Sequence, residues 1–205
     1  MTDGPLLWYL NRGTGVVIMV LLTLSVVLGV LSMGGGRPAA DGRRGIPRFV
    51  TQALHRNVAL LSVVALVVHV ATAVADTFVD IRWWQAVVPW WGSTYLPLWL
   101  GLGTLALDLI AVVVVTSALR TRLSHRVWSR VHLLSWVAWG VGVAHGIGIG
   151  TDLQALTDWA VIPTAACVLA VVVAAGYRFG RVLKPRARSD RRSHRPSDRR
   201  VEILS

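Results

Sequence analysis

Long apolar stretches with few charged positions dominate the chain. Five of them reach the about 20 mostly apolar residues that a membrane-spanning helix needs. We predict spans at roughly 8–33, 54–75, 96–118, 128–150 and 157–179. The stretches lack the alternation of apolar and polar positions that barrel strands show. Because a helix satisfies its own backbone hydrogen bonds in lipid, the pattern predicts an all-α membrane protein, a bundle of about five transmembrane helices.

The composition favours the same class of protein. Of the 205 residues, 54% are hydrophobic and 15% are charged, whereas soluble domains have about 25% charged residues. A net charge of +11 would suit nucleic acid, but the basic residues stand beside the spans and in the C-terminal tail. We therefore expect membrane lipid as a partner and no nucleic acid. The single cysteine, Cys167, excludes an internal disulfide and a cysteine-ligated cluster.

Basic residues lie almost entirely on one side of the predicted spans. Of the 21 lysines and arginines, only Arg12 and Arg82 fall on the other side, which leaves nineteen. Segments rich in Lys and Arg stay in the cytoplasm, so we expect the N-terminus outside and the C-terminus in the cytoplasm. The expected location is the plasma membrane, as a multi-pass protein. Residues 181–205 are predicted to form a basic, disordered cytoplasmic tail.

Four histidines inside two apolar stretches are the candidate functional residues. His55 and His69 lie in the second stretch, and His132 and His145 lie in the fourth. His69 follows His55 by fourteen positions, and His145 follows His132 by thirteen. On an α-helix these steps rise about 21 Å and about 19.5 Å, roughly two thirds of a hydrocarbon core of about 30 Å. The second and fourth spans run in the same direction, so His55 pairs with His132 near the inner surface and His69 with His145 near the outer. Since neutral imidazole is an axial ligand of haem iron, the pattern predicts two haems with these histidines as ligands.

The rotation between the histidines of each helix leaves two arrangements of the haems open. Fourteen steps of about 100° bring His69 within about 40° of His55, whereas thirteen leave His145 about 140° from His132. Either the fourth helix winds more tightly in one place, or the two haems approach it from different sides.

Ionisable residues in a membrane also shuttle protons or bind transported cations. The alternatives are a small histidine-containing membrane transporter and a cofactor-free assembly or scaffold protein.

The residues around these histidines resemble the ferric reductase-like transmembrane domain. That family includes the membrane parts of NADPH oxidases and ferric reductases and the haem subunit of methionine sulfoxide reductase systems. The resemblance rests on Leu54-His55-Arg56 followed by His69, and on Trp128-Ser129-Arg130-Val131-His132 followed by His145 and Asp152. The segment 88–108 also looks like that of short actinobacterial-style members. The resemblance covers about residues 6–180, which we expect to form one transmembrane haem domain.

The resemblance implies electron transfer through two haems b, from a cytoplasmic or quinol donor to an extracytoplasmic acceptor. His55 and His132 would hold the inner haem, and His69 and His145 the outer one. Arg12 would lie near the outer haem and pair with a propionate, or it would snorkel to the interface.

The chain has a short tail and no Gly-rich phosphate loop, so we expect no flavin or NAD(P)H domain. It would then be the haem-binding membrane component of an oxidoreductase. A separate flavoprotein reductase or quinol would donate electrons, and ferric iron, oxygen, a flavoprotein or a reductase would accept them.

Overall fold

The structure, a computed structural model, describes residues 4–34, 47–76, 81–150 and 159–183. These residues form helices and no strand: α1 (Gly4–Gly34), α2 (Arg48–Ala75), the 3₁₀ turn η1 (Trp83–Ala86), α3 (Pro97–Ala118), α4 (His125–His132), α5 (Leu134–Ile149) and α6 (Val161–Leu183). Five segments are long and apolar enough to cross a membrane, with α4 and α5 together forming one of them. For the described residues, the prediction of an all-α fold with five segments long and apolar enough to span a membrane is confirmed.

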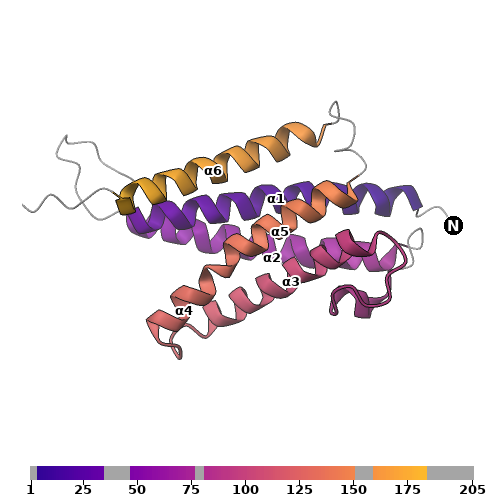
Figure 1. The fold of residues 1–205 in the computed structure, drawn as a ribbon, viewed down its shortest axis with the longest axis horizontal. Coiled ribbons are helices and arrows are strands. Elements are labelled where there is room, and N and C mark those ends of the chain that lie inside the picture. The colour runs from indigo at the N-terminus through magenta and orange to yellow at the C-terminus, as the bar shows by residue number, and fades with distance from the viewer. Residues whose placement is uncertain (1–3, 35–46, 77–80, 151–158, 184–205) are drawn as a thin grey trace, which may run out of the picture.

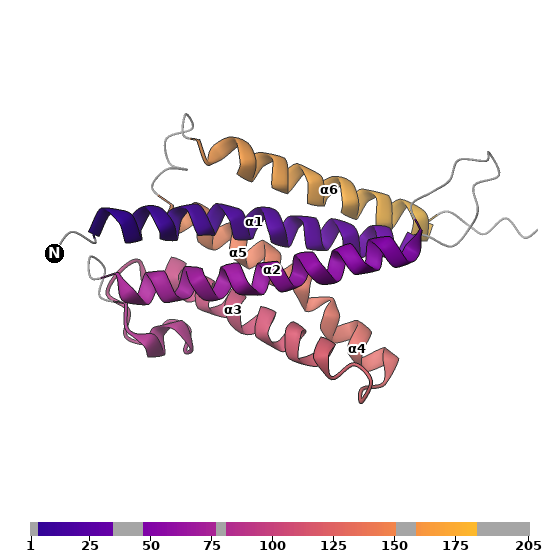
Figure 2. The ribbon, with the colours of Figure 1, turned by 180° about the vertical axis from the view of Figure 1, so that it is seen from behind.

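The helices alternate in direction, so α2 and the α4–α5 pair run the same way through the bundle (Figure 1). Helix α1 packs against α2, α5 and α6, whereas α3 packs against α4 and α5. Both ribbon views show α1, α2 and α6 side by side, with α3 and α4 diverging from them toward one end (Figure 2). The histidines lie on α2, α4 and α5, and these helices pack mainly on other neighbours, α2 on α1, and α4 and α5 on α3.

Small and weakly polar side chains fill the contacts between helices. The buried stripe by which α6 packs on α1 consists of Thr164, Cys167, Val171 and Ala174. Large apolar side chains point outward, as Ile162 does with 78% of its surface exposed. Helices packed in lipid show this distribution, because small residues let backbones approach while large apolar ones can face the lipid.

Helix α2 begins earlier than its hydropathy indicates. It starts at Arg48, directly after Pro47, six residues before the predicted start of the span. Polar residues in the first two turns, Arg48, Thr51 and Gln52, conceal these turns from a search for apolar residues. His55 therefore lies two turns inside the helix, where the backbone on both sides fixes its direction.

The fourth predicted span is two helices, because the helix is interrupted at Leu133. The amides of Leu133 and Trp136 each donate to the carbonyl three residues earlier, at 3.2 and 3.1 Å. The carbonyl of His132 accepts a hydrogen bond from the Ser135 hydroxyl at 2.8 Å. Since a 3₁₀ step turns the chain about 120° rather than about 100°, the interruption reduces the rotation between His132 and His145. Tighter local winding is thus the alternative that the structure supports.

The described part of the connection between α2 and α3, residues 81–96, is folded at the end of the bundle that holds the N-terminus. The buried side chain of Gln85 donates to the carbonyl of Gly92 at 2.8 Å, and the Thr104 hydroxyl of α3 donates to the Gln85 carbonyl at 2.7 Å. Trp90 has a φ of 62°, in the left-handed region. Its indole lies against Gly101 of α3, where a side chain would collide with it. These contacts fix the connection to the start of α3.

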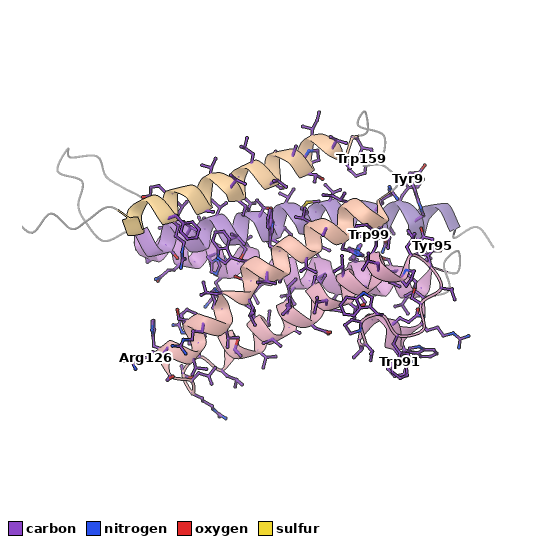
Figure 3. The ribbon with its side chains drawn as sticks, viewed as in Figure 1. Tyr9, Trp91, Tyr95, Trp99, Arg126 and Trp159 are labelled. Atoms are coloured by element: carbon purple, nitrogen blue, oxygen red, sulfur yellow. The ribbon has the colours of Figure 1, made fainter. Side chains whose placement is uncertain are left out.

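The two ends of the bundle carry different side chains. Figure 3 shows Tyr9, Trp91, Tyr95 and Trp159 at one end and Arg126 at the opposite end. Trp and Tyr are enriched at the membrane–water interface, whereas arginine is enriched in cytoplasmic segments. The predicted tail lies outside the described residues from position 184 onward.

Candidate functional site

The four predicted histidines form two pairs at two levels of the bundle. The ring centroids of His55 on α2 and His132 at the end of α4 are 6.2 Å apart, and the ring planes are inclined by 71°. His69 on α2 and His145 on α5 are close enough to interact electrostatically. The structure thus brings together the histidines that helix direction and depth pair in the sequence.

Backbone carbonyls hold three of these imidazoles through their Nδ1 atoms. Nδ1 donates from His55 to Ser25 at 2.9 Å, from His69 to Asn11 at 3.0 Å, and from His145 to Trp99 at 2.7 Å. Because a carbonyl oxygen can only accept, Nδ1 carries the proton and Nε2 keeps its lone pair. Metal-ligating histidines usually donate their other ring N–H in this way, and these three imidazoles make the same kind of bond.

His132 is held by a different set of contacts. Its Nδ1 lies 3.5 Å from the Ser117 hydroxyl, which is longer than an ordinary hydrogen bond. The indole of Trp128, one turn earlier on α4, stacks on the imidazole with centroids 5.0 Å apart and planes inclined by 23°. The indole nitrogen of Trp128 is buried and has no hydrogen-bond partner among the described residues.

On α1, a polar residue and a glycine contact each of the two α2 histidines, and these two sets of contacts are as far apart in the sequence as the histidines are. Fourteen positions separate His55 from His69, and the same number separates Asn11 from Ser25 and Gly15 from Gly29. A Cβ on the two glycines would lie 3.4 and 3.6 Å from the imidazole Cε1 atoms of His69 and His55. We did not predict these four α1 residues. The signal that could have found them is a polar residue followed four positions later by glycine, repeated at the histidine spacing.

The start of α1 surrounds the outer histidine pair. Nδ2 of Asn11 donates to the backbone carbonyl of His69 at 2.9 Å and to the Thr72 hydroxyl at 3.3 Å. Arg12 follows directly in the sequence and is half-buried, with its guanidinium 4.9 Å from the ring centroid of Trp8. The structure therefore places Arg12 at the level of the outer pair.

Two glycines let α3 and α5 approach each other beside the outer pair. A Cβ on Gly103 of α3 would lie 2.6 Å from both Cε1 and Nδ1 of His145. The indole of Trp99, one turn earlier, lies against Gly148 of α5, while the Trp99 carbonyl accepts the bond from His145. The His145 imidazole is thus enclosed between the Gly103 backbone and the Trp99 carbonyl.

The donor set suits a haem. An imidazole nitrogen binds a metal at about 2.0 Å and lies about 1.2 Å from its ring centre, so two imidazoles on opposite sides of one metal have centroids about 6.4 Å apart. The His55–His132 distance is 6.2 Å. An edge-to-face ring contact has a similar distance, so the Nδ1 hydrogen bonds are the stronger indication of ligation.

Paired histidines require a particular kind of metal group. The described part of the chain contains no cluster of three or more His, Cys, Asp or Glu side chains that could hold a metal ion. Two imidazoles at one level are the protein ligands that a haem iron takes in a bis-histidine site.

Two comparisons with known proteins identify no relative of this chain. A scan against models of protein families and a search of curated proteins both find no match for the chain. The function of the site is therefore inferred from its residues and their geometry.

Proposed function

We propose that this protein transfers electrons across a membrane through two haems b. His55 and His132 would bind the inner haem, and His69 and His145 the outer one. The observation that carries the proposal is the arrangement of four membrane histidines in two pairs, three of them with Nδ1 bonded to a backbone carbonyl. Bis-imidazole ligation needs such pairs with Nε2 available. The resemblance of the histidine segments to the ferric reductase-like transmembrane domain favours the same function.

In this proposal the residues of the chain bind the haem iron, orient the imidazoles and exclude water. A bound haem supplies an iron that accepts and releases single electrons. The carbonyl acceptors raise the basicity of His55, His69 and His145, which would lower the reduction potential of a haem bound at either level. The apolar exterior of the helices keeps both levels in a low dielectric. Arg12 would add positive charge at the outer level, where it would pair with a propionate or attract an anionic product.

We further propose that electrons pass from the cytoplasm outward across the plasma membrane. The excess of basic residues in the connections and tail on one side supports an outside N-terminus and a cytoplasmic C-terminus. The chain would act as the haem-binding membrane component of an oxidoreductase. A separate flavoprotein reductase or quinol would be the donor, and ferric iron, oxygen, a flavoprotein or a reductase would be the acceptor outside.

Haem content of the purified full-length protein tests this proposal. A pyridine haemochromogen assay should give about two haems b per chain, and dithionite should shift the Soret band and sharpen the α-band. A colourless protein purified from haem-replete cells would contradict the proposal.

Single alanine variants test which histidines share a haem. His69→Ala and His145→Ala should each remove the outer haem, whereas His55→Ala and His132→Ala should each remove the inner one. His194→Ala, a histidine outside the four, is the control and should leave both haems in place. The assignment is wrong if His69→Ala removes the haem that His132→Ala removes.

A further inference from the structure

His132 differs from the other paired histidines in what orients its imidazole. The carbonyl bonds of His55, His69 and His145 measure 2.9, 3.0 and 2.7 Å, whereas Nδ1 of His132 lies 3.5 Å from the Ser117 hydroxyl. A contact of that length gives little directional control. Helix α4 also ends at His132, where the regular backbone hydrogen bonds stop. The orientation of this ring therefore depends on another contact.

The stacked indole of Trp128 is that contact. Trp128 precedes His132 by four positions, so both side chains lie on the same face of α4, one turn apart. The ring planes are inclined by only 23°, with centroids 5.0 Å apart. An aromatic ring packed in this way restricts rotation of the imidazole about its bond to Cβ. The stacking therefore limits the planes that the His132 ring can take.

The indole nitrogen indicates a second role for the same side chain. It is enclosed by protein atoms and has no acceptor within the described residues. A buried donor without an acceptor is costly, and a buried indole N–H usually finds a partner. A phenyl ring at this position would stack without carrying the donor. The indole N–H therefore suits a hydrogen-bond acceptor that belongs to the group bound at His132 and enters the bundle with it.

We propose that Trp128 is a positioning residue of the inner haem: its ring fixes the plane of the His132 imidazole, and its N–H donates to a haem propionate. This proposal rests on the proposed function. A propionate suits the donor because a carboxylate forms the stronger, charge-assisted type of hydrogen bond. The burial of the indole nitrogen favours an acceptor inside the bundle over a lipid headgroup on its surface.

Two variants of the full-length, haem-loaded protein separate the ring from its donor. Trp128→Phe removes the N–H and keeps an aromatic ring. We expect two haems per chain and an unchanged electron paramagnetic resonance spectrum, but a lower midpoint potential of the inner haem alone, since the propionate loses a hydrogen bond that offsets its charge. Trp91→Phe, at an indole with 70% of its surface exposed, is the matched control and should leave both potentials unchanged.

Trp128→Leu removes the stacking ring as well. The g-values of a low-spin ferric haem depend on the relative orientation of its two imidazole planes. We therefore expect the g-values of the inner haem to shift in this variant, while those of the outer haem stay the same. The outer-haem signal also reports that the bundle is folded.

The possible failures of the two proposals are distinguishable. The role of Trp128 is overturned if the outer haem is retained and either the inner potential is unchanged in Trp128→Phe or the inner g-values are unchanged in Trp128→Leu. The electron-transfer function then stands. A wild-type protein that binds no haem overturns both proposals.

Discussion

At the scale of single residues, the position of His145 depends on contacts with no space for added atoms. His145 donates to the Trp99 carbonyl at 2.7 Å, and its ring lies against the backbone of Gly103. Closely packed interiors do not absorb even one added carbon without displacement. The geometry at this level is therefore sensitive to a single methyl group.

The change Gly103→Ala should remove the outer haem. Its Cβ would lie 2.6 Å from two atoms of the His145 ring, so the imidazole must move from the position in which we propose that it binds haem. The pyridine haemochromogen assay should then give about one haem per chain instead of about two. Gly29→Ala is the matched control, because its Cβ would stand 3.6 Å from the His55 ring, an ordinary contact. Two haems in the Gly103→Ala protein would mean that the contact does not position His145.

At the scale of helices, α1 organises the bundle. It packs against α2, α5 and α6, and its backbone at Asn11 and Ser25 holds the two histidines of α2. Between the two histidine levels, the indole N–H of Trp139 on α5 donates to the hydroxyl of Thr23 on α1 at 2.9 Å. Thr23 is only 4% exposed. This hydrogen bond joins the two helices inside the membrane-spanning region.

A double-mutant cycle on Thr23→Val and Trp139→Phe should show a favourable coupling between the two side chains. Hydrogen bonds between membrane helices contribute on average about 0.6 kcal/mol and at most about 1.7 kcal/mol to the free energy of unfolding. The coupling can be measured from unfolding of the four proteins in mixed micelles. Thr116→Val is the control, because that hydroxyl bonds only carbonyls of its own helix, those of Val112 and Val113. Strictly additive effects of the two changes would argue against the bond.

At the scale of the whole molecule, the alternation of helices fixes which connections share a side. The N-terminal end of α1 and the folded α2–α3 connection lie at one end of the bundle, and the α3–α4 connection lies at the other (Figure 1). The proposed orientation puts the first end outside, because segments rich in Lys and Arg stay in the cytoplasm. The proposed direction of electron transfer depends on this orientation.

Cysteine labelling tests the orientation. In a Cys167→Ala background, Thr94→Cys and Thr121→Cys place single thiols at exposed positions of the α2–α3 and α3–α4 connections. A membrane-impermeant maleimide should label the first in intact cells and the second only after permeabilisation. The native Cys167 is buried at 6% exposure, so its replacement removes background labelling. The opposite labelling pattern would reverse the orientation and the proposed direction of transfer.

The sequence alone determined the number of spans and the depth of each histidine. Span number follows from the length and hydropathy of each stretch, which are local properties. Histidine depth follows from the fixed rise of an α-helix. The number of spans and the depth of each histidine also determine which histidines can pair, since α2 and the α4–α5 pair run the same way.

Only the tertiary structure decided how each imidazole is held. The carbonyl that accepts from His69 lies 58 positions away along the chain, at Asn11, and no local pattern specifies which helices pack side by side. The interruption at Leu133 and the stacking of Trp128 on His132 likewise adjust the fourth span to its neighbours. Hydropathy reports only whether a residue can enter the membrane, whereas ring orientation depends on contacts between helices, and those exist only once the bundle has assembled.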